Sequence, residues 1–230
     1  MPERSGIFIA MKLKDKRLRA IIDLLPRCGV IADIGTDHGK LGCALLEEDK
    51  CLEVWFSDIS AVSLQKAKAL AEMLGLGSRS KFFVGDGARA LPGSPDAAVI
   101  AGMGGKTICA ILENGLKVLS SGVLVLAANT EQTLLRTFIM DNGLRIDEER
   151  AVRAAGRYYV LMRVIKGIEH YTYRELTAGP KLIEKKDDET TGYFRFRHRV
   201  ALTALEQAKT SLTANVEELK KELDVWETLI

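Results

Sequence analysis

VIADIGTDHG, residues 30–39, is the stretch that decides the fold. A short apolar run ends in Asp33 and then breaks at Gly35, as a buried parallel strand does where it passes into a ligand-binding loop. In doubly wound α/β proteins, ligands bind at the carboxyl ends of the strands. Gly35 would let the backbone approach a ligand closely. Two further acidic strand ends, Asp58 and Asp86, follow. Together the three predict a site for a nucleotide-like cofactor.

The segments around this stretch alternate between predicted strands and helices. Helices are predicted at 13–25, 40–48, 60–74, 107–114 and 130–140, and strands at 29–34, 51–57, 81–84, 96–101 and 122–128. Residues 144–155 and 157–165 follow as two strands joined near Gly156. This alternation predicts an α/β fold with a parallel sheet and helices on both faces. By analogy, a closing antiparallel hairpin is typical of Rossmann-like methyltransferases rather than dinucleotide oxidoreductases.

The composition changes after Lys166, and Gly179-Pro180 then breaks the chain. One long helix is predicted for residues 193–230, with an apolar stripe at alternating three- and four-residue spacings. The stripe consists of Leu202, Leu205, Leu212, Val216, Leu219, Leu223, Trp226 and Ile230. Its partner could be its own domain, a helix from 167–190 or a second subunit. We predict a cofactor-binding domain at 1–166 and a helical, coiled-coil-like domain at 167–230.

The overall composition predicts a globular protein of a reducing compartment. The 230 residues are 47% apolar and 28% charged, and a net charge of +2 gives no global basic field. The apolar run at 7–11 is too short for a signal peptide or a membrane span. No cysteine pair has metal-site spacing, so we expect no metal and a cytoplasmic protein with free thiols. The cysteines are Cys28, Cys43, Cys51 and Cys109.

The loop after the first strand lacks the glycine pattern of dinucleotide-binding proteins. Its glycines are Gly35, Gly39 and Gly42, and Asp37 stands where a pyrophosphate would need the second glycine. A carboxylate there suits a cationic cofactor without phosphate, and S-adenosylmethionine is such a molecule. The alternative is that Asp33 and Asp37 serve hydrogen bonding and capping within the loop.

The next two strand ends supply further candidate cofactor contacts. Asp58 lies 23 residues after Gly35, where an acidic residue can accept hydrogen bonds from both ribose hydroxyls. It could instead cap the helix that begins near Ser60. Asp86 and Gly87 follow the third strand, where the amino group of an adenine would lie. Turn formation is the alternative for this pair.

The fourth and fifth strand ends offer candidate substrate contacts. The fourth strand is followed by Gly102-Met103-Gly104-Gly105, where amino-methylating enzymes often have an Asn/Asp-Pro-Pro-aromatic motif. The glycines leave the backbone open to a ligand and Met103 offers an apolar wall, although a tight turn would also explain them. His38 is a candidate contact for a substrate base. Asn129 could hydrogen-bond a substrate edge.

Two basic clusters are candidate RNA contacts. Lysines and arginines crowd residues 12–19, and YFRFRHR at 193–199 interleaves aromatic side chains with cations. Interleaving of this kind suits phosphate contact and base stacking. A solvated helix face is the alternative for either cluster.

These motifs together resemble the TrmK family, the bacterial tRNA (adenine-22)-N1-methyltransferases. The resemblance rests on ADIGTDH at 32–38, IAGMGG at 100–105, KRL at 16–18, GRYY at 156–159 and the Gly179-Pro180 break. It therefore covers nearly the whole chain. The sequence departs from the family at residues 39–42, where Ala-Tyr-Leu-Pro is usual, and at 127–129, where Gln-Pro-Asn is usual. These departures flank the expected substrate pocket.

The resemblance implies a class I fold and methyl transfer from S-adenosylmethionine to N1 of an adenine in tRNA. The implied cofactor-binding residues are Arg17, Asp33, Gly35, Asp58, Ile59, Asp86, Gly87, Gly102 and Met103. The implied substrate-pocket residues are Asp37, His38 and Asn129. Arg17 could meet the cofactor carboxylate or an RNA phosphate. The expected partner is tRNA, no membrane association is expected, and the protein could be a monomer or a homodimer. A methyltransferase of a small molecule or protein, and an inactive cofactor-binding protein, are the alternatives.

Overall fold

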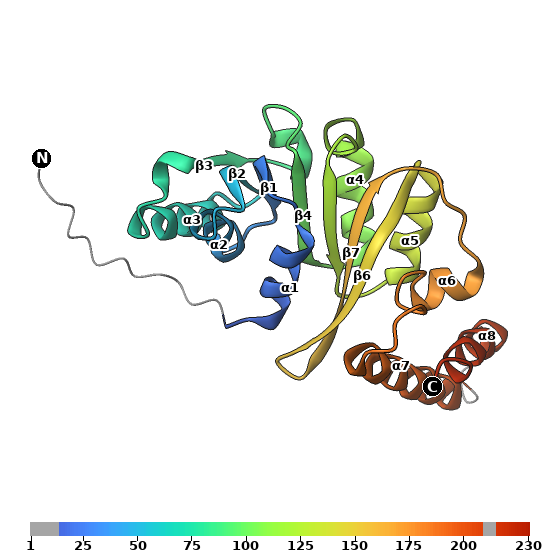
Figure 1. Ribbon diagram of the computed structural model, residues 1–230. Helices are drawn as coiled ribbons and strands as arrows, with labels where there is room; N and C mark the ends of the chain where they lie inside the picture. The colour runs from blue at the N-terminus through green and yellow to red at the C-terminus, as the bar shows by residue number, and fades with distance from the viewer. Residues whose placement is uncertain (1–13, 209–214) are drawn as a thin grey trace, which may run out of the picture.

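The computed structural model describes residues 14–208 and 215–230, and a seven-stranded sheet forms its centre (Figure 1). The strand order is β3-β2-β1-β4-β5-β7-β6. The strands are β1 (Cys28–Ile34), β2 (Cys51–Asp58), β3 (Ser80–Val84), β4 (Ala97–Met103), β5 (Val123–Ala128), β6 (Leu144–Ala154) and β7 (Arg157–Lys166). Strands β1 to β5 are parallel, and β7 pairs antiparallel with both β5 and β6. The predicted Rossmann-like sheet with a closing hairpin is confirmed.

Helices cover both faces of this sheet. They are α1 (Lys16–Leu24), α2 (Lys40–Glu47), α3 (Ala61–Met73), α4 (Gly105–Leu119) and α5 (Gln132–Asp141). One core joins α1, α2 and α3 to one face, with Ile21 and Leu45 fully buried. The other joins α4 and α5 to the opposite face through Ile108 and Leu135. Between β3 and β4 the connection is a 3₁₀ turn, η2 (Gly87–Ala90), rather than a helix. Among the described residues, no helix combines the length and apolar character that a membrane crossing needs.

The β6–β7 hairpin projects past the carboxyl ends of the parallel strands. Leu126 of β5 pairs with Met162, and β5 ends two residues later, so the first residues of β7 run on beyond the sheet. The two-residue turn has positive φ at both positions, 48° at Ala155 and 78° at Gly156. Such a turn matches the twist of the strands it joins. The tip lies between α1 and the C-terminal helices (Figure 1).

The prediction of a single long C-terminal helix from the apolar stripe is wrong. The structure instead has α6 (Tyr173–Ala178), α7 (Asp188–Ala208) and α8 (Val216–Glu227), and α8 packs on α7. The side chain of Asn215 caps α8 by accepting a hydrogen bond from the Glu218 N–H. The buried indole of Trp226 meets Tyr193 and Phe194 with ring centroids 6.1 Å apart. Leu223 and Trp226 of the stripe are therefore buried within the chain, whereas Leu202 and Ile230 are exposed. The stripe member Leu212 lies outside the described residues.

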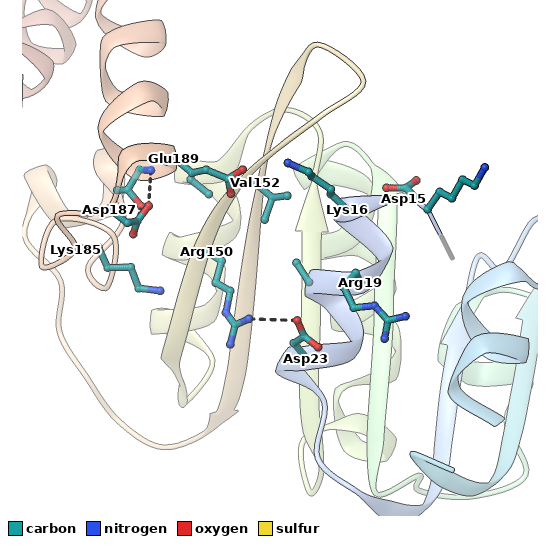
Figure 2. A pocket seen from close by; sticks show the side chains of 13 residues that line it. Asp15, Lys16, Arg19, Asp23, Arg150, Val152, Lys185, Asp187 and Glu189 are labelled. Atoms are coloured by element: carbon teal, nitrogen blue, oxygen red, sulfur yellow. Dashed lines mark hydrogen bonds and ion pairs between the residues drawn. The ribbon is translucent and has the colours of Figure 1, made fainter. Parts of the chain in front are cut away.

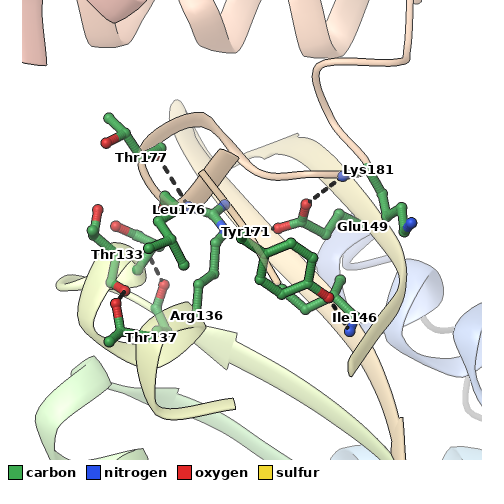
Figure 3. Close-up of polar contacts among 11 residues, drawn as sticks. Thr133, Arg136, Thr137, Ile146, Glu149, Tyr171, Leu176, Thr177 and Lys181 are labelled. Carbon is green, nitrogen blue, oxygen red and sulfur yellow. Dashed lines mark hydrogen bonds and ion pairs between the residues drawn. The ribbon is translucent and has the colours of Figure 1, made fainter. Parts of the chain in front are cut away.

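A buried ion pair attaches the C-terminal helices to the sheet (Figure 3). Arg136 of α5 donates from Nε to Oε1 of Glu149 on β6 at 2.9 Å, and both side chains are fully buried. Its Nη1 donates to the carbonyls of Leu176 and Thr177 in α6, each at 3.0 Å. The Lys181 N–H donates to Oε2 of Glu149 at 3.0 Å. The boundary at residue 166 remains a prediction, and this network spans it.

Candidate active site

The loop after β1 is organised by Asp33, whose side chain is buried. Its Oδ2 accepts hydrogen bonds from the Thr36 hydroxyl at 2.7 Å and from the Gly42 N–H at 3.2 Å. Burial raises the pKa of Asp33 to about 6, although the two hydrogen bonds oppose the rise and the charge of Asp58 adds to it. Asp33 therefore carries an energetically costly charge at neutral pH.

We expect Asp33→Asn to change how the stability of the ligand-free protein depends on pH. The raised pKa means that the folded state binds a proton more readily than the unfolded state, so ionisation destabilises the fold as pH rises from 3.8 to about 6. The difference corresponds to about 3 kcal/mol at most. Urea unfolding at several pH values should show wild type losing stability relative to Asp33→Asn across this window. A constant difference between the two proteins would contradict the assignment.

Met103, at the end of β4, lies over Gly35. Gly35 has a φ of 75°, and a Cβ atom at this position would clash with the Met103 side chain. Two cavities meet at this pair, since both residues line each of them. Glycine is thus required at position 35 for two reasons: its φ is positive, and the Met103 side chain approaches it closely.

The first cavity, about 300 Å³, lies at the ends of β1, β2 and β3 and against α4. Its lining is Ile34, Gly35, Ser57, Asp58, Ile59, Asp86, Gly87, Met103, Thr107, Ala110, Ile111 and Asn114. The carboxylate of Asp58 accepts from the Ser60 N–H at 2.8 Å and from the Asp37 N–H at 3.2 Å. Ile59 is 77% exposed beside it. Asp86 forms no hydrogen bond or ion pair through its side chain with any residue that the structure describes.

The second cavity, about 500 Å³, lies between the loop after β1 and α1. Its lining is Asp15, Arg17, Leu18, Asp33, Gly35, Thr36, Asp37, His38, Lys40, Leu41, Ala101, Gly102 and Met103. Asp37 has a φ of 51°, and its Oδ2 lies 2.5 Å from Nδ1 of His38. The guanidinium of Arg17 lies 5.1 Å from the ring centre of Tyr159. The predicted loop residues therefore share one cavity with a cation from α1.

Of the candidate site residues, Asn129 alone lines neither cavity. Its N–H donates to the Met103 carbonyl at 2.8 Å and its side chain is exposed, so it lies beside the site. One wall of the first cavity was not predicted from the sequence. It is supplied by α4, through Thr107, Ala110, Ile111 and Asn114. The i, i+3, i+4, i+7 spacing of these four after the glycine run was the available signal.

A third cavity, about 440 Å³, lies between α1, β6 and the start of α7 (Figure 2). Its cations mostly have carboxylate partners. Arg150 pairs with Glu148 at 2.8 Å and lies 3.9 Å from Asp23, and Arg19 pairs with Glu48 at 2.6 Å. No parallel strand ends here. The groove therefore lacks the features of the other two cavities.

The two joined cavities suit a cationic nucleoside better than a phosphate. A carboxylate at the end of β2 can accept hydrogen bonds from sugar hydroxyls, and exposed Ile59 with Ile111 offers apolar walls for a base. The acidic loop around Asp33 and Asp37 would repel phosphate and attract a positive charge. This is the geometry of a site for a cofactor such as S-adenosylmethionine.

Comparison with known proteins agrees with this geometry. A family model described as a methyltransferase domain matches residues 14–162. A Mycoplasma pneumoniae protein, named as a candidate tRNA methyltransferase, is 33% identical over 161 residues, which cover 67% of this chain and 73% of that protein. The chain belongs to the TrmK family of methyltransferases.

Two further matches extend over more of the chain. The tRNA (adenine(22)-N(1))-methyltransferase of Bacillus subtilis is 29% identical over 180 residues, which cover 75% of this chain and 76% of that enzyme. A candidate tRNA (m1A22) methyltransferase from Streptococcus pneumoniae, solved with S-adenosyl-L-methionine, superposes with a TM-score of 0.84 at 24% identity. That superposition covers 93% of this chain and 98% of the other, so the C-terminal helices share the fold.

The departure from the TrmK motif at residues 39–42 has a packing reason in this chain. A Cβ atom at Gly39 would lie 2.7 Å from Cβ of Ala67 on α3. One at Gly42 would clash with the ring of Phe56. The start of α2 lies close against β2 and α3, so neither position has room for a larger side chain.

Proposed function

We propose that this protein transfers a methyl group from S-adenosyl-L-methionine to N1 of adenine 22 in tRNA. The observation that carries the proposal is the pair of joined cavities, with the Asp58 carboxylate at the end of β2 and an acidic loop beside it. The named activity of the Bacillus subtilis relative supports the choice of substrate. The free thiols of all four cysteines suit a cytoplasmic protein.

The residues present fit this cofactor. Asp58 would bind the ribose hydroxyls, and Asp86, whose carboxylate is exposed, would meet the adenine amino group beside Ile59. Asp33 faces the second cavity, where an ammonium group would offset the cost of its buried charge. Arg17, on the opposite wall, would pair with the cofactor carboxylate. When bound, the cofactor supplies a methyl group that its positive sulfur makes electrophilic.

The chain's own residues would act mainly by positioning. Adenine N1 has an in-plane lone pair and can attack without prior loss of a proton, so alignment of the reacting atoms is the main requirement. Attack at N1 leaves a positive charge on the adenine. Asp37, paired to His38 at the mouth of the second cavity, would stabilise that charge as it develops. Met103 and the open backbone of Gly102 would form the wall between adenine and cofactor.

A methyl-transfer assay tests the proposal directly. Purified protein with labelled S-adenosyl-L-methionine and unmodified tRNA transcripts should yield labelled 1-methyladenosine after nucleoside digestion. A transcript with guanine in place of adenine 22 should take up no label, because it lacks the nucleophile. Label in any other nucleoside, or full labelling of the guanine-22 transcript, would refute the assigned position. Transfer to small molecules or protein with none to tRNA would refute the substrate class.

A further inference from the structure

The tip of the β6–β7 hairpin and the exposed side of α7 form a surface to which the proposed reaction assigns no role. We define this tip surface as Arg153, Arg157, Tyr158, Arg195, Phe196 and Arg199. Tyr158 and Phe196 join its two halves, with ring centroids 5.5 Å apart and planes tilted by 32°. Beside Phe196, a hollow of about 460 Å³ runs along α7 past Arg199 and Val200.

The aromatic side chains of the 193–199 stretch divide into buried and available ones. Tyr193 and Phe194 are buried against Trp226 and cannot stack on a ligand. Phe196, in contrast, is 38% exposed. Tyr158 presents one side to Phe196, and the guanidinium of Arg153 lies 5.8 Å from its ring centre. The surface thus offers a flat apolar platform rimmed by cations.

The four arginines of the tip surface are exposed, and none forms an ion pair with any residue in 14–208 or 215–230. Their neighbour Arg197 shows the opposite behaviour, since it pairs with Glu222 at 2.8 Å. The charged groove of Figure 2 also differs, because its arginines have carboxylate partners. Unpaired guanidinium groups around an exposed ring are complementary to a phosphate backbone with unstacked bases.

The tip surface and the candidate active site lie on opposite faces of the hairpin, at the same edge of the sheet. Successive side chains of a strand point to opposite faces, so Tyr159 turns away from Tyr158 and contacts Arg17, which lines the second cavity. The hairpin tip also extends beyond the carboxyl edge of the sheet, the same edge at which both cavities open. A polymer with one nucleotide in the cavity would reach the tip surface along this edge.

We propose that the tip surface binds the RNA substrate, holding backbone phosphates with its four arginines and stacking one unpaired base on Phe196. This inference rests on the proposed function, which supplies the RNA, and it identifies where the RNA is held outside the catalytic cavity. The surface contributes affinity for tRNA rather than chemistry. Variants here should therefore raise KM for tRNA and leave kcat at saturating tRNA unchanged.

Binding of fluorescently labelled tRNA, measured at several salt concentrations, tests the inference. Arg195→Gln with Arg199→Gln should weaken binding about tenfold near physiological salt and lower the slope of log K against log salt by about 2, because two phosphate contacts are lost. Phe196→Leu should weaken binding by about 5- to 150-fold, since stacking on one base is removed. Its salt slope should stay that of wild type.

Matched controls are Arg174→Gln on α6 and Lys117→Gln on α4, which are exposed cations away from the tip surface. Both should bind tRNA as wild type does. Binding of S-adenosylhomocysteine and the melting temperature, unchanged in every variant, would show that the fold is intact.

The outcomes separate the two proposals. If wild type methylates tRNA but the tip variants bind tRNA with the affinity and salt slope of wild type, the proposed role of the tip surface is overturned and the proposed function stands. If wild type binds tRNA without methylating it, the function fails, and the variants still decide the surface by their binding. If wild type binds no tRNA, both proposals are overturned.

Discussion

Glu149→Ala is expected to lower the free energy of unfolding by about 3–5 kcal/mol. The substitution leaves the Arg136 guanidinium buried without its carboxylate, in a region where neither side chain has any exposure. It also removes the acceptor of the Lys181 N–H. Because whole domains are stable by only about 5–15 kcal/mol, this loss should be evident as a large shift of the urea midpoint, followed by tryptophan fluorescence.

Two comparisons isolate the buried pair. Glu48→Ala removes the partner of Arg19 at the surface, where the expected loss is about 1 kcal/mol or less. Combining Glu149→Leu with Arg136→Met should cost less than Glu149→Ala alone, because no charge is then left buried. Among the residues that the structure describes, Nη2 of Arg136 has no hydrogen-bond partner, so the double substitution also removes one unsatisfied buried polar atom. Equal losses for Glu149→Ala and Glu48→Ala would contradict this account.

Asp58→Ala is expected to weaken binding of S-adenosylhomocysteine by about 100-fold or more. Hydrogen bonds to a charged group contribute about 1.5–3 kcal/mol each. The variant would lack the two that the Asp58 carboxylate accepts from the ribose hydroxyls. The substitution also frees the Asp37 and Ser60 N–H groups that Asp58 now holds, which loosens the loop. Titration calorimetry measures the change directly.

Asp58→Asn serves as the conservative comparison. Its amide oxygen can still accept one hydrogen bond, so the expected loss is smaller, about tenfold. The melting temperature of each ligand-free variant, measured alongside, shows whether the fold is intact. If Asp58→Ala bound the ligand as tightly as wild type, Asp58 would serve only to hold the Asp37 and Ser60 N–H groups.

Local pattern made the main residues of the candidate site predictable. Asp33, Asp58 and Asp86 each follow a β-rich run, and parallel strands bring their carboxyl ends to one edge. The two C-terminal helices were not predictable in the same way. Asn215, which starts α8, lies between apolar positions whose spacing continues on both sides. Periodicity alone does not reveal a chain reversal inside such a stripe.

The buried ion pair could not be predicted from the sequence because β6 contains an irregularity. Regular alternation from the buried Leu144 and Ile146 would place Glu149 on the opposite face. The register shifts between Ile146 and Glu148, which reverses the alternation and turns Glu149 inward. Nothing in the residue types around 147 signals the bulge. The bulge presents Glu149 to Arg136 of α5, a contact that the local sequence pattern does not reveal.

The hydrophobic cores on the two faces of the sheet are built from different lengths of the chain. The core under α1, α2 and α3 draws on residues up to Leu161, whereas the opposite core includes Trp226 on α8. During synthesis on the ribosome, the first core can close while the C-terminal helices are still being made. On the second face, Tyr193 and Phe194 stay uncovered until α8 has emerged and brings Trp226 against them. Protection of that nascent face, rather than formation of the cofactor-binding loops, therefore sets when folding of this protein is complete.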